Sequence, residues 1–271
     1  MQKEMGFMDH LEELRRRLFY MAIGIFVFSI VLFVLKDWVF ERIIFAPRRP
    51  DFLAFRAWCQ FGQFTGIGNR LCVTEVNYEL INTTMLGNFS AHILVSLIGG
   101  FIVSFPLTFY QIWRFIQPGL HGHEAAAARG VVLFGSLLFF MGVLFGYFVI
   151  APLSLQFLGN YTLGDVQARI ALMSYMKTVA SITLAAGLVF EVPLVIYFLA
   201  RLGLVTPKML KSYRKHMLVA VLLLAAVITP PDVTSQILVA MPVLFLYEIG
   251  IMVAARVIRK RDEGASHNDP K

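Results

Sequence analysis

The stretch TVASITLAAGLVFEVPLVIYFLA, residues 178–200, decides the fold class of this protein. Glu191 is the only formal charge in its 23 residues. A helix of about 20 residues, at ~1.5 Å per residue, crosses the ~30 Å hydrocarbon core of a bilayer. The stretch therefore predicts a transmembrane helix with a carboxyl group near mid-depth. Pro193 follows two residues later and lacks a backbone donor, so we expect it to disturb the helix beside that carboxyl group.

Glu191 has two interpretations. An acid at this depth costs roughly 2.5–3.5 kcal/mol on insertion scales, so it must be neutral, paired, or turned toward protein or water. It can hydrogen-bond a neighbouring helix and only hold a bundle together. It can also be a contact point for a molecule that enters the membrane or docks there, and the functional role of most intramembrane carboxylates favours this second interpretation.

The composition agrees with a membrane protein. The chain has 271 residues, is 58% hydrophobic with a mean hydropathy of +0.71, and has only 15% charged residues, against about 25% in soluble domains. Arg15, Arg16 and Arg17 precede an apolar run at 18–35 that lacks a small-residue cleavage site. We therefore expect a first membrane helix there and no cleavable signal peptide.

We predict an all-α integral membrane protein with one membrane domain over residues 1–261. Its six transmembrane helices are expected at about 18–35, 90–112, 130–150, 178–200, 217–229 and 236–253. An outer loop fills 36–89, and 262–271 is expected to be a disordered cytoplasmic tail. Gly99 and Gly100 in the second span would let helices approach closely. The last two spans are short for a bilayer, so the hairpin either thins the local membrane or ends in the interface.

The basic residues set the expected orientation. With the N-terminus inside, the inner segments hold 16 Lys and Arg residues and the outer segments hold eight, six of them in the long 36–89 loop. Because short loops decide orientation, both termini are predicted to be cytoplasmic. The net charge of +7 is then an orientation signal and does not indicate a nucleic-acid site.

Both cysteines, Cys59 and Cys72, fall in the predicted outer loop. That side of a bacterial inner membrane is oxidising, so a disulfide is compatible with the sequence, and two free thiols are the alternative. A closed loop of ~15 residues would contribute about 3 kcal/mol in the chain-entropy model.

Two inner segments carry further acids. In DHLEELRRR, residues 9–17, Glu13 precedes Arg17 by four residues on an amphipathic helix, so the segment can simply be a solvated interfacial helix. In YQIWRFIQPGLHGHE, residues 110–124, Glu124 is the only acid between residues 90 and 164. Together Glu13 and Glu124 could accept two guanidinium groups, because a carboxylate pairs bidentately with the planar arginine fork. A solvated loop acid without a ligand is the alternative for Glu124.

Several kinds of site are not expected. His121 and His123 have a metal-like spacing, but no further His or Cys lies near them in the sequence, so we expect no metal site. The sequence lacks a P-loop, a G-x-S-x-G motif and an H-E-x-x-H motif. We therefore expect neither an enzyme nor a cofactor. Energy for any transport must come from elsewhere, such as the transmembrane potential.

Six stretches together resemble the TatC family, the membrane receptor of the twin-arginine protein translocase. They are HLEELRRRL at 10–18, FAP at 45–47, YQIWRFIQPGLHGHE at 110–124, FEVP at 190–193, TPPDVTSQ at 229–236 and YEIG at 247–250. They stand in the family's order and six-span spacing. The resemblance extends over nearly the whole chain, except about 48–80 and the tail after 261.

The resemblance implies a curved, glove-like scaffold of six helices in the bacterial inner membrane. It implies binding of the twin-arginine signal peptides of folded precursor proteins at the cytoplasmic face. It also implies recruitment of single-span TatA/TatB-type subunits, self-association in the complex, contact with membrane lipid, and export driven by the proton-motive force. Nucleic acid is not among the expected partners.

The resemblance also assigns residues. The acids that match those associated with the arginine pair are Glu13 and Glu124, and the neighbouring signal-peptide surface matches Arg15, Arg17, Phe115, Pro118 and Leu120. The positions that match the family's intramembrane partner contact are Glu191, Thr229 and Gln236, and those that match its outer functional positions are Pro47 and Asp232.

Two departures and two other functions are weighed against this assignment. The outer loop 48–80 looks longer than the family's, and Gly122 stands where we associate a basic residue with the family. A proton-coupled small-molecule transporter would use Glu191 as its proton carrier, but we find no convincing internal repeat of the kind such transporters often show. A passive scaffold without a ligand is the third hypothesis.

Overall fold

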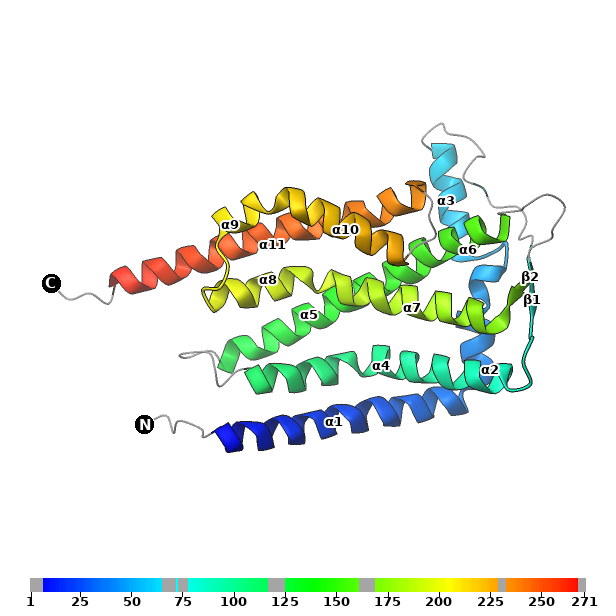
Figure 1. Cartoon of the computed structure of the whole chain (residues 1–271), viewed down its shortest axis with the longest axis horizontal. Coiled ribbons are helices and arrows are strands. Elements are labelled where there is room, and N and C mark those ends of the chain that lie inside the picture. The colour runs from blue at the N-terminus through cyan, green and yellow to red at the C-terminus, as the bar shows by residue number, and fades with distance from the viewer. Residues whose placement is uncertain are drawn as a thin grey trace. The chain divides into compact units, whose positions relative to one another are not determined.

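The computed structural model describes residues 7–64, 72, 78–116, 125–160, 169–228 and 233–267. These segments are mainly helical (Figure 1). They form two compact units, one of residues 1–140 and 167–180 and the other of residues 141–166 and 181–271. Among the described residues, five helices are long and apolar enough to cross a membrane, over Leu11–Val34, Gly87–Ile116, Gly130–Asn160, Leu172–Arg201 and Val239–Arg259.

The first unit is built on two long helices that lie side by side, α1 (Phe7–Val34) and α4 (Gly87–Ile116) (Figure 1). Their close approach depends on glycine. A Cβ atom on Gly100 would lie 2.7 Å from the backbone nitrogen and 2.8 Å from the Cα atom of Ser29, and one on Gly99 would lie 2.7 Å from a methyl group of Leu32. The two glycines thus allow the expected close approach of α1 and α4, and Gly100 lies directly against the backbone of α1.

Aromatic side chains fill the rest of this unit. Phe105 of α4 stacks on Phe139 of α5 (Ala125–Phe145), with ring centroids 3.6 Å apart, and Trp113 of α4 is fully buried. The hydroxyl of Tyr175 in α7 (Leu172–Phe190) donates to the carbonyl of Ile44 at 2.8 Å. This bond attaches the start of α7 to the segment that follows α1, namely α2 (Lys36–Trp38), η1 (Val39–Ile44) and η2 (Ala46–Arg48).

The segment between α1 and α4 contains structure that the sequence did not predict. Helix α3 (Leu53–Phe64) lies within the expected outer loop, and Cys59 in the middle of this helix is bonded to Cys72. Strand β1 (Glu79–Ile81) pairs in parallel with β2 (Arg169–Ala171). The all-α prediction was therefore wrong for these six residues. The pairing satisfies backbone groups in two loops and brings Glu79 opposite Arg169, with a nitrogen–oxygen distance of 4.0 Å.

The second unit contains the remaining helices. These are η5 (Gly146–Ile150), α6 (Ala151–Asn160), α8 (Val192–Arg201), α9 (Pro207–Ser212), α10 (Arg214–Ile228) and α11 (Val233–His267), together with the ends of α5 and α7. Helix α11 lies beside α8 and α10 (Figure 1). Ile196, Ala200 and Tyr247 belong to the apolar cluster between α8 and α11.

The bounds of the helices differ from those of the expected spans, including the last two. Helix α10 has 15 described residues and is not among the five spanning candidates, so a sixth span stays a prediction. Helix α11 reaches His267 and so extends into the expected tail 262–271.

We predict that Gly100→Ala destabilises the protein by about 1–3 kcal/mol, because the added methyl group would overlap Ser29. Gly24→Ala is the matched control, since a Cβ atom on Gly24 has no atom within 4 Å. That change should be neutral or stabilising by up to about 1 kcal/mol, because alanine is the better helix former. Thermal unfolding of both variants in detergent measures the difference. Equal effects of the two changes would contradict the tight contact between α1 and α4.

Candidate functional site

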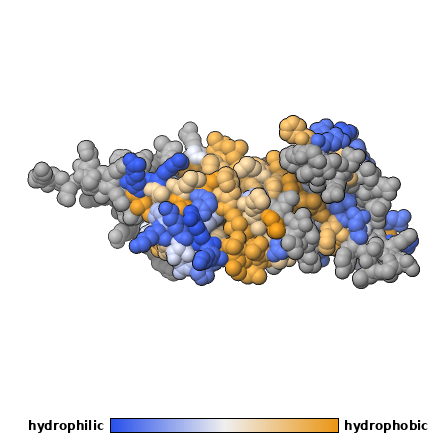
Figure 2. Space-filling view, turned by 90° about the horizontal axis from the view of Figure 1, so that it is seen from above, coloured by the Kyte–Doolittle hydropathy of each residue, from blue (hydrophilic) through white to orange (hydrophobic). Residues whose placement is uncertain are grey.

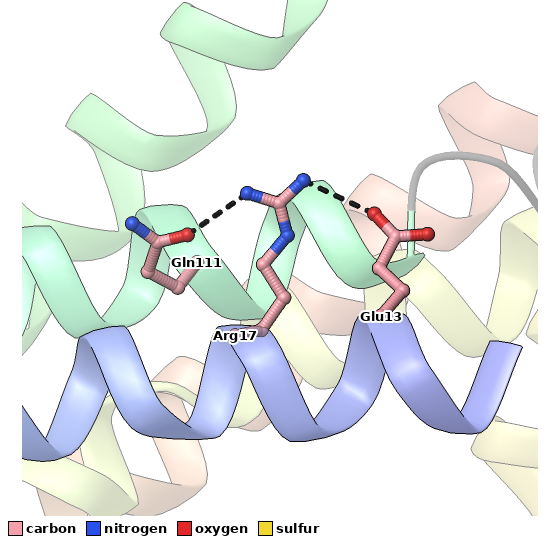
Figure 3. Close-up of polar contacts among 3 residues, drawn as sticks. All are labelled: Glu13, Arg17 and Gln111. Atoms are coloured by element: carbon pink, nitrogen blue, oxygen red, sulfur yellow. Dashed lines mark hydrogen bonds and ion pairs between the residues drawn. The ribbon is translucent and has the colours of Figure 1, made fainter. Parts of the chain in front are cut away.

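Arg17 joins the first turns of α1 to the last turns of α4 (Figure 3). Its Nη2 atom donates to the Glu13 carboxylate at 3.0 Å, and its Nη1 atom donates to the Gln111 side-chain oxygen at 3.1 Å. Glu13 and Arg17 are one helical turn apart on α1, so their pairing follows from the four-residue spacing. Gln111 comes from α4, so the guanidinium group holds the two helices in one register.

The cluster of Glu13, Arg17 and Gln111 is partly buried, so its charged groups need partners within the protein. The side chain of Arg17 is 9% exposed and that of Glu13 is 18% exposed. A buried charge is costly unless it is paired and hydrogen-bonded, and both terminal nitrogens of Arg17 have such a partner, while its buried Nε has none among the described residues. The second oxygen of Glu13 points away from Arg17 (Figure 3). Because an ionised carboxylate has about four acceptor positions, Glu13 can accept a further donor while it keeps Arg17.

The neighbouring pair on α1 differs in burial. Arg15 lies 3.8 Å from Glu12, and the two side chains are 82% and 74% exposed. Exposed pairs of this kind contribute about 0–1 kcal/mol. Of these two acids, Glu13 is therefore held in place and Glu12 is solvated.

The end of α4 forms the first part of the second expected segment, residues 110–124. Phe115 is half-buried there, and the guanidinium group of Arg114 lies 5.6 Å from the ring centroid of Tyr110. Pro118, Leu120 and Glu124 lie outside the described residues, as do His121 and His123. The expected pairing of Glu13 with Glu124 thus stays a prediction. Among the described residues, no group of three His, Cys, Asp or Glu residues could hold a metal ion.

Glu191 stands at a break between α7 and α8. Its amide donates to the carbonyl of Leu188, three residues back, at 3.1 Å, and its own carbonyl accepts from Leu194 and Val195 at 3.0 Å. Pro193 occupies the first turn of α8 and has no N–H group to continue the α7 ladder. The expected disturbance beside the carboxyl group is therefore present, and it divides the span in two.

The Glu191 carboxyl group is buried among apolar groups. Glu191 is 8% exposed, and neither carboxylate oxygen has a hydrogen-bond partner in the part of the chain that the structure describes. A narrow apolar cavity in the same unit is lined by its neighbours Val189 and Phe190, with Phe145 and Val221 opposite. A carboxyl group here is most stable when it is protonated or given a partner.

The remaining predicted residues are dispersed. The side-chain amide of Gln236 donates to the carbonyl of Leu222 at 2.9 Å, so it joins α11 to α10. Pro47 is buried in η2. Thr229 and Asp232 lie outside the described residues, so their roles stay predictions.

Sequence reasoning missed two polar contacts. Gln111 lies in the quoted 110–124 stretch, but its partner is 94 residues away and no local spacing indicates it. Arg214 donates to Glu248 at 2.7 Å across 34 residues, from α10 to α11. Glu248 lies in the YEIG stretch, and its position inside an apolar span was the only available signal that it needs a cation.

Comparison with known proteins identifies the family. The family model described as "Sec-independent protein translocase protein (TatC)" matches residues 9–242. The chain belongs to the TatC family. It is 34% identical over 262 residues to the TatC protein of Blattabacterium. The alignment covers 96% of this chain and 98% of that protein. The TatC protein of Aquifex aeolicus is also 34% identical, with coverage of 94% and 97%.

Solved structures agree. A crystal structure described as the twin arginine translocase receptor TatC has a TM-score of 0.69 at 34% identity, and it covers 92% of this chain and 99% of that chain. A second, in the detergent DDM, has a TM-score of 0.72 at 34% identity, with coverage of 90% and 99%. The protein is thus a multi-pass membrane component of a Sec-independent protein translocase and does not belong to an enzyme family. The small-molecule transporter hypothesis receives no support from TatC membership.

We predict that Glu191→Met raises the free energy of unfolding by about 1–3 kcal/mol, because it removes a buried carboxyl group whose oxygens have no partner among the described residues. Thr183→Val is the control, since the Thr183 hydroxyl is also buried without a partner among the described residues. Both variants should be stabilised in thermal unfolding, but only Glu191→Met should lower protein export. A loss of stability in Glu191→Met would show that the carboxyl group already has a partner.

Proposed function

We propose that this protein is the receptor subunit that binds twin-arginine signal peptides of folded precursor proteins at its cytoplasmic face. The TatC crystal structures, described as twin arginine translocase receptors, cover at least nine-tenths of the chain and support this role. In the proposal the two arginines pair with Glu13 and Glu124. The surrounding surface consists of Arg15, Arg17, Phe115, Pro118 and Leu120.

The contact between Arg17 and Glu13 is the observation that carries this proposal. Arg17 holds one oxygen of the Glu13 carboxylate at 3.0 Å, and Gln111 holds Arg17 at 3.1 Å. The carboxylate therefore keeps one orientation before a peptide arrives, which lowers the entropy lost on binding. Its second oxygen can accept from a peptide guanidinium. Because that group is planar and presents several donors, it fits a fixed carboxylate better than a lysine ammonium does.

We further propose that the intramembrane acid Glu191 contacts single-span TatA/TatB-type subunits, together with Thr229 and Gln236. The break at Glu191 supports this role, since a buried carboxyl group without partners gains most from an incoming polar group. Export would then be driven by the proton-motive force. In the assembled complex the protein would also contact further copies of itself.

For the membrane arrangement we propose six spans, with α10 as the fifth in chain order, and both termini in the cytoplasm of a bacterium. The basic residues of the short loops support this orientation. The bond between Cys59 and Cys72 supports it independently, because disulfides persist on the oxidising side of the inner membrane. Pro47 and Asp232 would then act at the outer side.

Peptide discrimination tests the receptor role. Wild-type protein should bind an Arg-Arg signal peptide more tightly than the matched Lys-Lys peptide. Glu13→Gln should reduce that preference at least about ten-fold, because it removes the charge while an amide oxygen still accepts from Arg17. Binding is measured by titrating labelled peptides onto purified protein.

Glu12→Gln is the control for this experiment, because Glu12 lies on the same helix but is solvent-exposed. It should leave the preference nearly unchanged. The two-carboxylate site is wrong if Glu13→Gln retains the full preference, or if both changes weaken it equally.

Cysteine labelling tests the orientation. In intact cells an impermeant maleimide should label Cys59 and Cys72 only after reduction, because the two thiols are joined in the folded protein. Labelling that appears only after the membrane is opened would place the 36–89 segment inside and overturn the arrangement. Labelling after reduction in broken cells verifies that the reagent reaches both thiols.

A further inference from the structure

The start of α10 and the middle of α11 border an open groove in the second unit. It has a volume of about 410 Å³, which falls within the ~300–1,000 Å³ range of ligand sites. Its lining consists of Arg214, Lys215, Leu218, Leu244, Phe245, Tyr247 and Glu248. None of these residues is used in the proposed peptide or partner contacts.

The lining changes polarity from one helical turn to the next. On α10, Lys215 is exposed and Leu218, three residues later, is 44% exposed. On α11, Glu248 stands one turn from Phe245, which is 66% exposed. One turn of helix advances about 5.4 Å. The groove therefore has a charged rim and, about one turn away, an apolar floor that is open to its surroundings.

Figure 2 shows the same division on the surface of this unit. Hydrophilic residues gather over α9 and the start of α10, directly beside a hydrophobic band over the rest of α10. The segment from Arg201 to His216 contains five Lys and Arg residues and no acid. Its charge therefore favours an anion at the rim.

The ion pair at the rim leaves room for such an anion. Arg214 donates to Glu248 at 2.7 Å with one of its nitrogens, while a guanidinium group has five N–H donors in all. Glu248 thus compensates part of one positive charge, and Lys215 beside it is fully available for a phosphate. The floor is fixed from beneath, because the buried Tyr247 hydroxyl donates to the carbonyl of Leu210 at 2.8 Å.

We infer that this groove binds an anionic phospholipid, with the headgroup phosphate on Lys215 and Arg214 and an acyl chain along Leu218, Leu244 and Phe245. A soluble anion would use the rim but would leave the apolar floor exposed. A bare hydrophobic helix would cover the floor but would leave the charges at the rim unmatched. A lipid of negative charge satisfies both, and juxtamembrane lysines are known to attract such lipids.

Native mass spectrometry of the purified full-length protein tests the inference. Titration with phosphatidylglycerol should give a saturable bound lipid, and phosphatidylcholine should bind at least five-fold more weakly. Lys215→Gln should weaken phosphatidylglycerol binding about five-fold, as expected for one lysine near an anionic headgroup. The control Lys208→Gln removes the same charge from an exposed position outside the groove and should change binding less than two-fold.

A second pair of variants tests the apolar half. Phe245→Ser should also weaken lipid binding, whereas Met252→Ser, at an exposed position of α11 outside the groove, should not. The inference is overturned if the two lysine variants behave alike, if the lipid classes bind equally, or if Phe245→Ser has no effect. Displacement of the lipid by millimolar inorganic phosphate would also overturn it, because the site would then recognise a free anion.

Discussion

The guanidinium group of Arg17 is the contact on which the inner part of the first unit depends. Its side chain is nearly buried, so its charge must be paired within the protein. Glu13 supplies the charge and Gln111 supplies the second acceptor, from another helix. The close glycine contact at Gly100 then requires α1 and α4 to lie at one separation. Packing and polar pairing thus fix the same two helices from two positions, and the orientation of Glu13 is a consequence of both.

Glu191 illustrates the opposite use of a buried acid. Glu13 is partly exposed and has its cation in place, while Glu191 is more deeply buried and has no hydrogen-bond partner among the described residues. Natural proteins tolerate such a group where function needs it, since an apolar residue would be more stable. The difference suggests two kinds of recognition. Under the proposed function, Glu13 would offer a preformed acceptor to a charged ligand, and Glu191 would offer a buried carboxyl group to a partner within the membrane.

The helices and their close contacts could largely be predicted from the sequence, because both depend on local patterns. Long apolar runs predicted the five helices that are long and apolar enough to cross a membrane, and Gly99 and Gly100 predicted the close approach on α4. The break at Glu191 followed from Pro193. The four-residue spacing of Glu13 and Arg17 indicated their pair.

What could not be predicted depends on tertiary contacts. Strands β1 and β2 have three residues each and pair across 90 positions, so no periodicity exists for the sequence to reveal. Gln111 and Glu248 have their partners on other helices. A polar residue in an apolar run indicates that a partner is needed, but it does not indicate which residue that partner is. Helix α3 is amphipathic but lies between Pro and Gly residues in a segment that composition alone describes as a loop.

The shortness of α10 connects the membrane to the groove beside it. Its 15 described residues extend about 22 Å, which is less than the ~30 Å of a typical hydrocarbon core. A short helix makes the bilayer thin locally or makes its terminal side chains reach outward, at a cost of a fraction of a kcal/mol per Å. Lys215 and Arg214 stand at the first turn of α10, at one end of this short helix. A phosphate drawn toward them would lower the cost of thinning, so the ion pair of Arg214 and Glu248 and a bound lipid would stabilise the same end of the helix.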